Sequence, residues 1–441
     1  MYKYFANALI VNEGREEYGN ILVKANRIEA ISNEPLSDLP LDTEYIDCTG
    51  LIAIPGIIDA HVHFRQPGLE YKADMSSESK AALAGGVTTV LEMPNTNPTT
   101  TSEKSLEDKL KLANENMYCN YGFFFGLTNS NYSTAKTITR DNCCGLKLFL
   151  GSSTGNMLVD DKNSLRELFS ITDKVISAHC EDESIIRKNT AEYKERYGDK
   201  ATAKLHPLIR SSESCYQSSA FAVQMAKENN TRFHIAHLTT EKELSLLTEG
   251  NIENKRITAE VSPIHLWFCD EDFEKYGNLI KCNPSVKTKQ DRAALREGLR
   301  TDKIDIIATD HAPHLKEEKL KPYFEAPSGI PSIQHSLLIM LQLVKQKELS
   351  LTKLVEKMAH NPAKLFDIKE RGYIKKGYFA DIVLINSNKK THITKESLFS
   401  KCGWSPFEGE TFDNEIVATY LNGEKVYQNG KVSEAKFGVK I

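Results

Sequence analysis

The sequence predicts an α/β protein built on a (β/α)8 barrel, with a small β-sandwich domain assembled from both ends of the chain. Short apolar runs alternate with helix-like segments through the middle, whereas both ends show alternating apolar and polar positions. The alternative is an open, doubly wound sheet. However, no Gly-x-Gly-x-x-Gly follows the first buried run and no GxxxxGK[ST] loop occurs, which favours the closed barrel.

The two ends of the chain carry strand and hairpin patterns. In the first fifty residues, apolar runs such as 8–11 are separated by glycines, which is typical of short antiparallel strands. Near the other end, two Asn-Gly pairs predict tight hairpins, at Asn422-Gly423 and Asn429-Gly430. We therefore expect a barrel and one composite β domain, with residues 54–364 in the barrel and residues 1–53 plus 365–441 in the β domain.

The middle of the chain contains eight short apolar runs that read as buried strands. They lie at 57–64, 88–93, 121–126, 145–150, 175–180, 232–238, 257–261 and 305–310. Helical patterns fall between several of them and after the last, at 102–116, 164–173, 213–229, 290–300, 332–347 and 351–360. Strand–helix alternation of this length is typical of a parallel sheet, and eight strands predict closure into a barrel.

Composition excludes several classes of protein. With 56 Lys+Arg against 60 Asp+Glu, the formal net charge is −4, and there is no basic tract. Neither nucleic acid nor an anionic membrane is therefore expected as a partner. No apolar run is long enough to span a bilayer, and the first residues lack a signal-peptide pattern. Nine cysteines without a CxxC pair fit reduced thiols, so we expect a cytoplasmic protein.

Polar side chains gather at the ends of the predicted strands. His61 and His63 lie two positions apart, so both project from the same face of the first strand. His179, His237 and Asp310 end the fifth, sixth and eighth strands, at the face of a barrel where active sites are built. An isolated His-x-His also occurs by chance, but four imidazoles and a carboxylate at one face suit Zn²⁺ or a similar ion.

Lys147 lies in the middle of the fourth predicted strand, where an unpaired ammonium would be costly to bury. One interpretation is a lysine that reaches the barrel mouth or pairs with a carboxylate. The other is that CO₂ converts the amine to a carbamate, an anion whose two oxygens can bridge two metal ions. The residues alone leave both interpretations open.

Several longer motifs closely resemble the dihydroorotases, which belong to the cyclic-amidohydrolase part of the amidohydrolase superfamily. These motifs are Pro55-Gly56-Ile-Ile-Asp59-Ala-His61-Val-His63-Phe-Arg65-Gln-Pro67-Gly68, Met93-Pro-Asn95-Thr96-Asn-Pro98, Cys282-Asn283-Pro284, Ala308-Thr-Asp310-His-Ala-Pro-His314 and His360-Asn-Pro-Ala-Lys364. The resemblance spans nearly the whole chain. It implies a metal-dependent hydrolase barrel with a small β domain made from both chain ends.

The resemblance also implies two Zn²⁺ ions per chain and a CO₂-derived carbamate on Lys147. By this resemblance one ion is held by His61, His63, Lys147 and Asp310, and the second by Lys147, His179 and His237. The implied reaction is the reversible cyclisation of N-carbamoyl-L-aspartate to L-dihydroorotate, a step of pyrimidine synthesis. In it, a hydroxide shared by the ions attacks the ring amide while Asp310 serves as general acid and base.

The substrate site is expected on the same face of the barrel. Arg65 offers a planar fork for the ring carboxylate, and by resemblance Asn95 and His314 complete that site. Asn283 is expected to contact the pyrimidine ring, together with backbone groups around Ala326–Gly329. For Arg65 the alternative is a salt bridge at the rim, and for Asn95 a turn or cap.

The segment 151–156 is rich in small residues, and it reads either as a mobile lid or as an ordinary connection. If it closes as a lid, Ser153 or Thr154 is expected to touch the substrate. The competing functions are a hydantoinase, dihydropyrimidinase or allantoinase, or a non-catalytic assembly protein of the superfamily. Members of the family are often homodimers and some associate with aspartate transcarbamoylase; the sequence leaves both open for this chain.

Overall fold

The computed structural model describes residues 1–151 and 157–441. Eight parallel strands form one sheet whose order follows the chain, as predicted. The strands are β6 (Ile57–Val62), β7 (Val87–Glu92), β8 (Asn120–Gly126), β9 (Gly145–Phe149), β10 (Val175–His179), β11 (Arg232–Ile235), β12 (Ile257–Val261) and β13 (Ile306–Ile307). A parallel bridge between Val62 and His311 joins the first strand to the segment after the last, so the sheet curls into a barrel.

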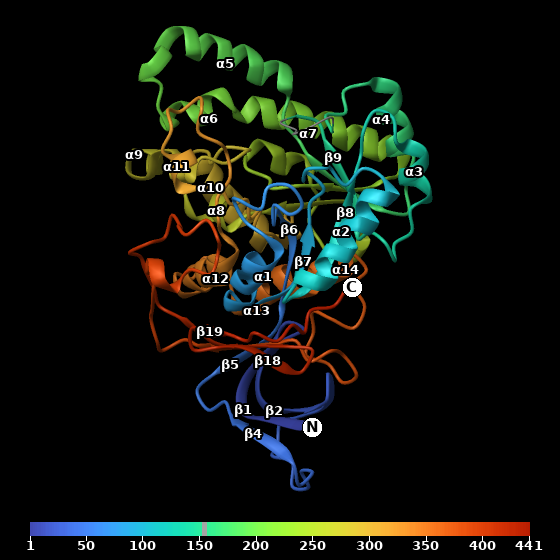
Figure 1. Cartoon of the computed structure of the whole chain (residues 1–441), viewed down its shortest axis with the longest axis vertical. Helices are drawn as coiled ribbons and strands as arrows, with labels where there is room; N and C mark the ends of the chain where they lie inside the picture. The colour runs from blue at the N-terminus through green and yellow to red at the C-terminus, as the bar shows by residue number, and fades with distance from the viewer. Residues whose placement is uncertain (152–156) are drawn as a thin grey trace.

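Helices surround the barrel strands on the outside (Figure 1). Those of eight residues or more are α1 (Met75–Ala84), α2 (Glu103–Asn116), α4 (Lys162–Phe169), α5 (Glu183–Tyr197), α7 (Ser212–Asn229), α10 (Lys289–Arg300) and α12 (Ser336–Lys345). The shorter ones are α3 (Tyr132–Thr137), α6 (His206–Ile209), α8 (Pro263–Trp267), α9 (Phe273–Tyr276), α11 (Lys316–Lys319), α13 (Leu351–Val355) and α14 (Asn361–Leu365). The fold class predicted from the sequence is therefore confirmed.

Strands from both ends of the chain lie side by side below the barrel in Figure 1 and form one nine-stranded mixed sheet. Its order is β19-β18-β17-β14-β5-β1-β2-β3, and β4 pairs with β1 as well. The strands are β1 (Tyr2–Asn12), β2 (Arg15–Lys24), β3 (Arg27–Ser32), β4 (Thr43–Asp47), β5 (Ile52–Pro55), β14 (Ile382–Asn386), β17 (Glu415–Leu421), β18 (Glu424–Gln428) and β19 (Lys431–Val432). A separate short ribbon pairs β15 (Thr391–His392) with β16 (Thr411–Phe412).

Local sequence signals decide several of these boundaries. Both predicted Asn-Gly turns connect antiparallel strands, and Asn422 and Gly423 adopt φ of 52° and 79°, the left-handed region that a tight hairpin requires. Helix α2 begins after the predicted cap Ser102, whose side chain accepts from Ser105 N at 3.2 Å. The helix expected over 351–360 is different: α13 ends at Val355, and a π-helical turn then leads into α14.

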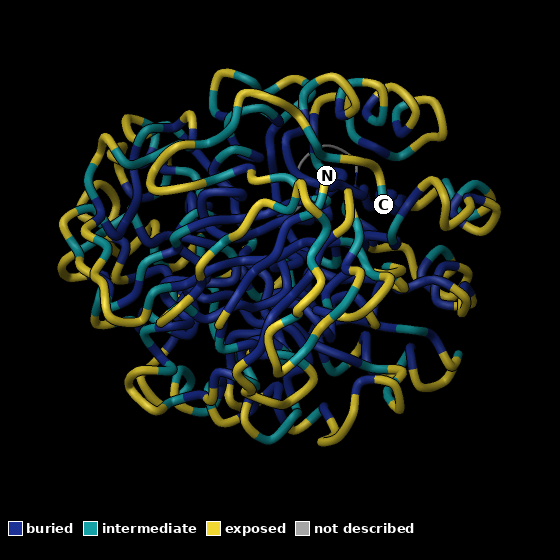
Figure 2. The backbone as a smooth tube through the Cα atoms, turned by 90° about the horizontal axis from the view of Figure 1, so that it is seen from below, coloured by how far each residue is buried: buried dark blue, intermediate teal, exposed yellow. Residues whose placement is uncertain are grey.

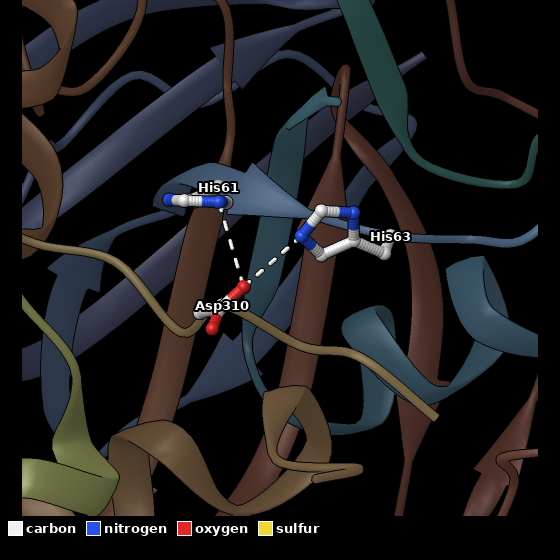
Figure 3. Close-up of side chains that lie close together, drawn as sticks. All are labelled: His61, His63 and Asp310. Atoms are coloured by element: carbon white, nitrogen blue, oxygen red, sulfur yellow. Dashed lines mark hydrogen bonds and ion pairs between the residues drawn. The ribbon is translucent and has the colours of Figure 1, made fainter. Parts of the chain in front are cut away.

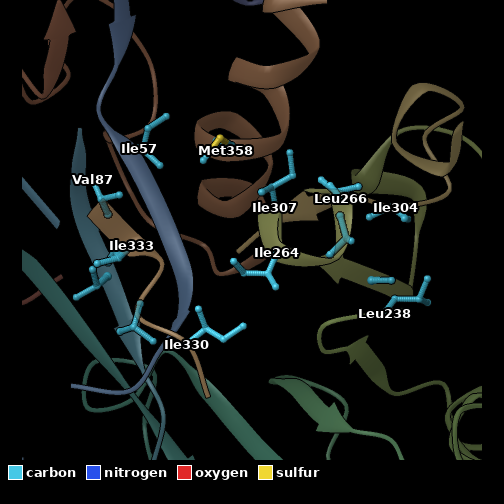
Figure 4. Close-up of a cluster of buried hydrophobic side chains, with 14 of the residues drawn as sticks. Ile57, Val87, Leu238, Ile264, Leu266, Ile304, Ile307, Ile330, Ile333 and Met358 are labelled. Carbon is cyan, nitrogen blue, oxygen red and sulfur yellow. The ribbon is translucent and has the colours of Figure 1, made fainter. Parts of the chain in front are cut away.

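The apolar core fills the space between the barrel strands and the outer helices, and the buried backbone forms the centre of Figure 2. Figure 4 shows part of this core, where Ile57 of β6, Val87 of β7 and Ile307 of β13 lie near Ile333 and Met358. Such tight packing fixes where the carboxyl ends of the strands emerge. Within the described residues, no helix is both long and apolar enough to cross a membrane.

A buried ion pair links the composite sheet to the barrel. Arg371 Nη1 donates to Asp381 Oδ2 at 2.5 Å and to Asn422 Oδ1 at 2.8 Å. The other oxygen of Asp381 accepts from Asn422 N at 2.7 Å, and Asn422 Nδ2 reaches Asn120 Oδ1, on the barrel strand β8, at 3.0 Å. Because both charges are buried, each depends on the other for compensation.

Replacing Arg371 by Met is expected to lower the free energy of unfolding by about 3–5 kcal/mol, because the Asp381 carboxylate would stay buried without its cation. Urea denaturation followed by circular dichroism measures the change. The matched control is Lys104→Met, which breaks the exposed pair with Asp108 and should leave the midpoint unchanged. A loss below about 1 kcal/mol for Arg371→Met would contradict the expected role.

Candidate metal centre and substrate cavity

The first group of ligands lies where β6 and β13 end. His63 Nε2 is 3.0 Å and His61 Nε2 is 3.4 Å from Asp310 Oδ1, and Figure 3 shows the three side chains converging on one point. One ligand atom from each residue fits within 4.8 Å of the others, which is the spacing a single ion requires. Two of the predicted histidines and the predicted aspartate therefore meet as expected.

The second group comes from β9, β10 and the end of β11. His179 Nδ1 lies 3.0 Å from His237 Nε2, and the His61 and His237 rings are 5.3 Å apart, so this pair adjoins the first group. Lys147 is fully buried in β9. Within residues 1–151 and 157–441, neither Lys147 Nζ nor His237 Nδ1 has a hydrogen-bond partner. Two orphaned buried polar atoms beside an imidazole pair are the mark of a site built for a further group.

The outer nitrogens of three histidines are held by acceptors. Glu260 accepts from His61 Nδ1, Asn95 Oδ1 lies 2.8 Å from His63 Nδ1, and Glu181 Oε2 lies 2.8 Å from His179 Nε2. Such bonds fix the tautomer and the orientation of each ring, so the other nitrogen is directed to the centre. The ring nitrogens that remain to face the centre are His61 Nε2, His63 Nε2 and His179 Nδ1.

The protonation states suit metal binding. Burial would raise the pKa of Asp310, but the charge of His61 and the hydrogen bond and charge of His63 lower it to about 2. Burial lowers the pKa of His63 to about 4 and that of Lys147 to about 8. An ionised aspartate and neutral imidazoles are the forms that ligate metal. The donor set therefore fits a divalent ion of the zinc type.

Strained backbone coincides with this site. Arg65, His237 and Asp310 have φ of 67°, 35° and 50°, in the left-handed region that side chains other than glycine rarely adopt. Each such residue costs on the order of 1–3 kcal/mol, and such residues cluster at functional sites. The strain sets the direction of two candidate ligands and of the cation next to them.

A cavity of about 610 Å³ opens over the candidate ligands. The predicted substrate residues that line it are Arg65, Asn95, Asn283, His314 and Gly329. Ala326 is buried beside it, and its neighbours Pro327 and Ser328 form part of the wall. Ser153 and Thr154 lie outside the described residues. Most of the residues predicted to contact substrate therefore line one cavity, and their roles stay predictions.

Arg65 and His314 form one wall of the cavity. Arg65 Nε donates to Pro313 O at 3.0 Å, and Arg65 Nη2 lies 3.1 Å from His314 Nε2. Lys72 Nζ donates to His314 Nδ1 at 3.0 Å, so Nε2 carries the ring proton and faces Ser328 O at 3.0 Å. Burial and the charge of Arg65 lower the pKa of His314, which keeps the ring neutral.

Sequence reasoning missed the residues that support the ligands. Glu181 is fully buried, and it contacts both His179 and Arg210, which also lines the cavity. Glu260 is a carboxylate within the apolar run of β12. Because a buried charge needs a partner, its position could have indicated a role in the site. Asn95 was expected to bind substrate, but its Oδ1 is engaged by His63, which leaves its amide nitrogen for a ligand.

Comparison with known proteins agrees with this geometry. The model of the Amidohydrolase family matches residues 52–426. A protein named dihydroorotase from Methanothermobacter thermautotrophicus is 33% identical over 427 residues, which cover 97% of this chain and 93% of that protein. A dihydroorotase from Bacillus subtilis is also 33% identical, over 97% of this chain and 98% of its own.

Solved structures show the same architecture. The L-hydantoinase (dihydropyrimidinase) from Arthrobacter aurescens superposes with a TM-score of 0.93 at 27% identity, and the match covers 99% of each chain. The family model spans most of the sequence and the relatives exceed 30% identity over nearly their whole length. The chain therefore belongs to the amidohydrolase family.

Proposed function

We propose that this chain acts as a dihydroorotase, which interconverts N-carbamoyl-L-aspartate and L-dihydroorotate in pyrimidine synthesis. The observation that carries the proposal is the position of Arg65: its guanidinium lines the cavity within reach of His314, beside the candidate ligands. Dihydroorotate has a ring carboxylate that hydantoin and dihydrouracil lack, and a guanidinium fork suits that group. Full-length relatives named dihydroorotase support the same function.

The candidate ligands fit two zinc ions. His61, His63 and Asp310 would hold one ion, His179 and His237 the other, and a carbamate on Lys147 would be shared by both. When bound, the ions would lower the pKa of a water molecule and polarise the ring carbonyl. The unpartnered, buried Nζ of Lys147 supports the carbamate, because a carbamate oxygen would give this position the partners that an ammonium lacks among the described residues.

Asp310 is suited to move the proton. Its lowered pKa keeps the carboxylate ionised at neutral pH, so it can accept a proton from the attacking water and pass it to the leaving ring nitrogen. In the direction of cyclisation the same carboxylate takes the proton of the ureido nitrogen. Arg65 would hold the carboxylate, and the amide nitrogen of Asn95 would donate to it. His314 would join them by redirecting its Nε2 proton from Ser328 O to the carboxylate, while Asn283 would orient the ring.

A hydantoinase is the second candidate, because the L-hydantoinase structure superposes over almost the whole chain. A spectrophotometric assay with dihydroorotate, hydantoin, dihydrouracil and allantoin, with Zn²⁺ and bicarbonate supplied, separates the two. We expect turnover of dihydroorotate above all others. Turnover of hydantoin or allantoin without dihydroorotate would refute the proposal.

Replacing Arg65 by Met is expected to lower kcat/KM for dihydroorotate about 100-fold, because the ring carboxylate loses a charge-assisted hydrogen bond in a buried site. Steady-state kinetics measure the loss, and the zinc content is determined in parallel to show that the ligand set is intact. The matched control is Arg187→Met, which removes another cation of the same cavity wall. Equal losses in both variants would mean that Arg65 supplies only general positive charge.

Carboxylation of Lys147 should depend on pH. Burial lowers the pKa of Lys147 to about 8, so the neutral amine that attacks CO₂ is populated as the pH rises through about 8, well below the usual range for lysine. With dissolved ¹³CO₂ held constant, the carbamate signal in ¹³C NMR is expected to grow over that interval. Lys147→Ala should lose the signal and the activity, and short carboxylic acids should restore part of the activity. Wild-type-like activity of Lys147→Ala would show that the bridge is unnecessary.

A further inference from the structure

Two lysines are buried beneath the wall of the substrate cavity, and their ammonium groups donate hydrogen bonds to backbone carbonyls. Lys319, the last residue of α11, donates from Nζ to Lys281 O at 2.8 Å, Gly329 O at 2.9 Å and Pro327 O at 3.0 Å. Lys281 donates from Nζ to Tyr323 O and Ala326 O, each at 2.6 Å. Five carbonyl bonds therefore converge on two ammonium groups.

Four of these bonds hold one segment, residues 323–329, which we call the 323–329 loop, and the fifth joins Lys319 to Lys281 O. The last three residues of the loop line the cavity, as does Asn283, two residues after Lys281. Gly329 N donates to Lys281 O at 2.9 Å. The loop therefore bonds both the backbone and the side chain of Lys281, in the segment that carries Asn283. The lysines thus fix the part of the wall that faces the substrate.

Burying two ammonium groups without a carboxylate partner is energetically unfavourable, which indicates that both lysines have a specific role. Within the described part of the chain, the hydrogen bonds of Lys319 and Lys281 all go to carbonyl oxygens, and neither lysine forms an ion pair with a carboxylate. Burial lowers the pKa of Lys319 to about 7 and that of Lys281 to about 8. An apolar side chain would fill the space without that penalty, so the ammonium groups are retained for the carbonyls that they orient.

The 323–329 loop contacts the cavity wall that His314 and Arg65 form. Ser328 O accepts from His314 Nε2 at 3.0 Å, and the same ring lies next to Arg65. A Cβ on Gly329 would come within 2.8 Å of the His314 ring and within 2.5 Å of Ala312 O, so the loop backbone packs directly against these groups. Any shift of the loop would therefore move His314 relative to Arg65.

We propose that Lys319 and Lys281 are positioning residues for substrate: they lock the 323–329 loop and so hold His314 and Arg65 in register for the substrate carboxylate. The identity of the substrate rests on the proposed function, whereas the locking of the loop does not. The two ammonium groups also add positive potential beneath a wall that faces an anion. Neither lysine touches the reacting atoms, so binding should suffer more than the chemical step.

The test replaces Lys319 by Met in the zinc-loaded protein, with Lys281→Met as a second, milder variant that loses two carbonyl bonds rather than three. We expect KM for dihydroorotate to rise about tenfold while kcat stays within about threefold, because the lost order weakens binding before the transition state. The matched control is Lys357→Met, since Lys357 is equally buried but bonds Asp302 and does not line the cavity.

Hydrogen–deuterium exchange of the peptide that contains the 323–329 loop gives a readout independent of turnover. Exchange there should accelerate in Lys319→Met and Lys281→Met but not in Lys357→Met, at unchanged zinc content. Unchanged exchange in both loop variants, or a loss confined to kcat, would overturn the proposal. If the wild-type protein does not turn over dihydroorotate, the proposed function fails, and the exchange result still decides whether the lysines lock the loop.

Discussion

Glu260, a buried carboxylate on β12, joins both groups of candidate ligands to the barrel. Its Oε1 accepts from His61 Nδ1 and, at 3.2 Å, from His237 N, while Oε2 lies 3.0 Å from His234 Nε2. Burial would raise the pKa of Glu260, yet the charge of His61 and the hydrogen bond from His234 hold it well below its usual range. Because one charge satisfies donors from β6 and β11 together, ligand geometry depends on strand packing and not on the ligands alone.

Local charge at the cavity, rather than the net charge of the chain, favours binding of an anion. The chain carries a formal charge of −4, so the molecule as a whole exerts no attraction on dihydroorotate. Cations are instead concentrated on the cavity wall, where Arg65 and Arg187 face the space and Lys319 lies beneath it. Arg65 is buried, so its charge acts at short range with little screening, whereas Arg187 is exposed to solvent and paired with Glu183, so it contributes less.

The barrel, and the meeting of several candidate ligands at one end of it, could be predicted from the sequence because both follow simple periodic rules. Strand alternation puts His61 and His63 on one face, and the convergence of strand ends brings Asp310 to the same end of the barrel. The supporting residues obey no such rule. Glu181 and Lys319 act through partners in other segments of the chain, Arg210 and Lys281, and such pairings arise only when the loops fold against each other.

Two helices of the outer layer, α1 and α5, were not predicted, for a related reason. In α5 the only buried residue is Ile186, so its sequence lacks the apolar stripe by which a helix is recognised. Helix α1 has the opposite character, since Glu78 and Ser79 are buried among its alanines and obscure the pattern. In both helices tertiary contacts, rather than local periodicity, decide the structure.

The C-terminal part of the chain contributes to the site as well as to the composite sheet. Glu78 of α1 accepts from His311 Nε2 at 2.8 Å and from Ser400 Oγ at 2.6 Å, and His311 directly follows Asp310 in the chain. Trp404 Nε1 donates to His314 O at 2.7 Å. A segment near residue 400 therefore supports the loop that carries both Asp310, the proposed general base, and His314, a proposed substrate contact. Since these bonds are buried, the order of the 310–314 loop and the packing of the C-terminal segment are energetically coupled.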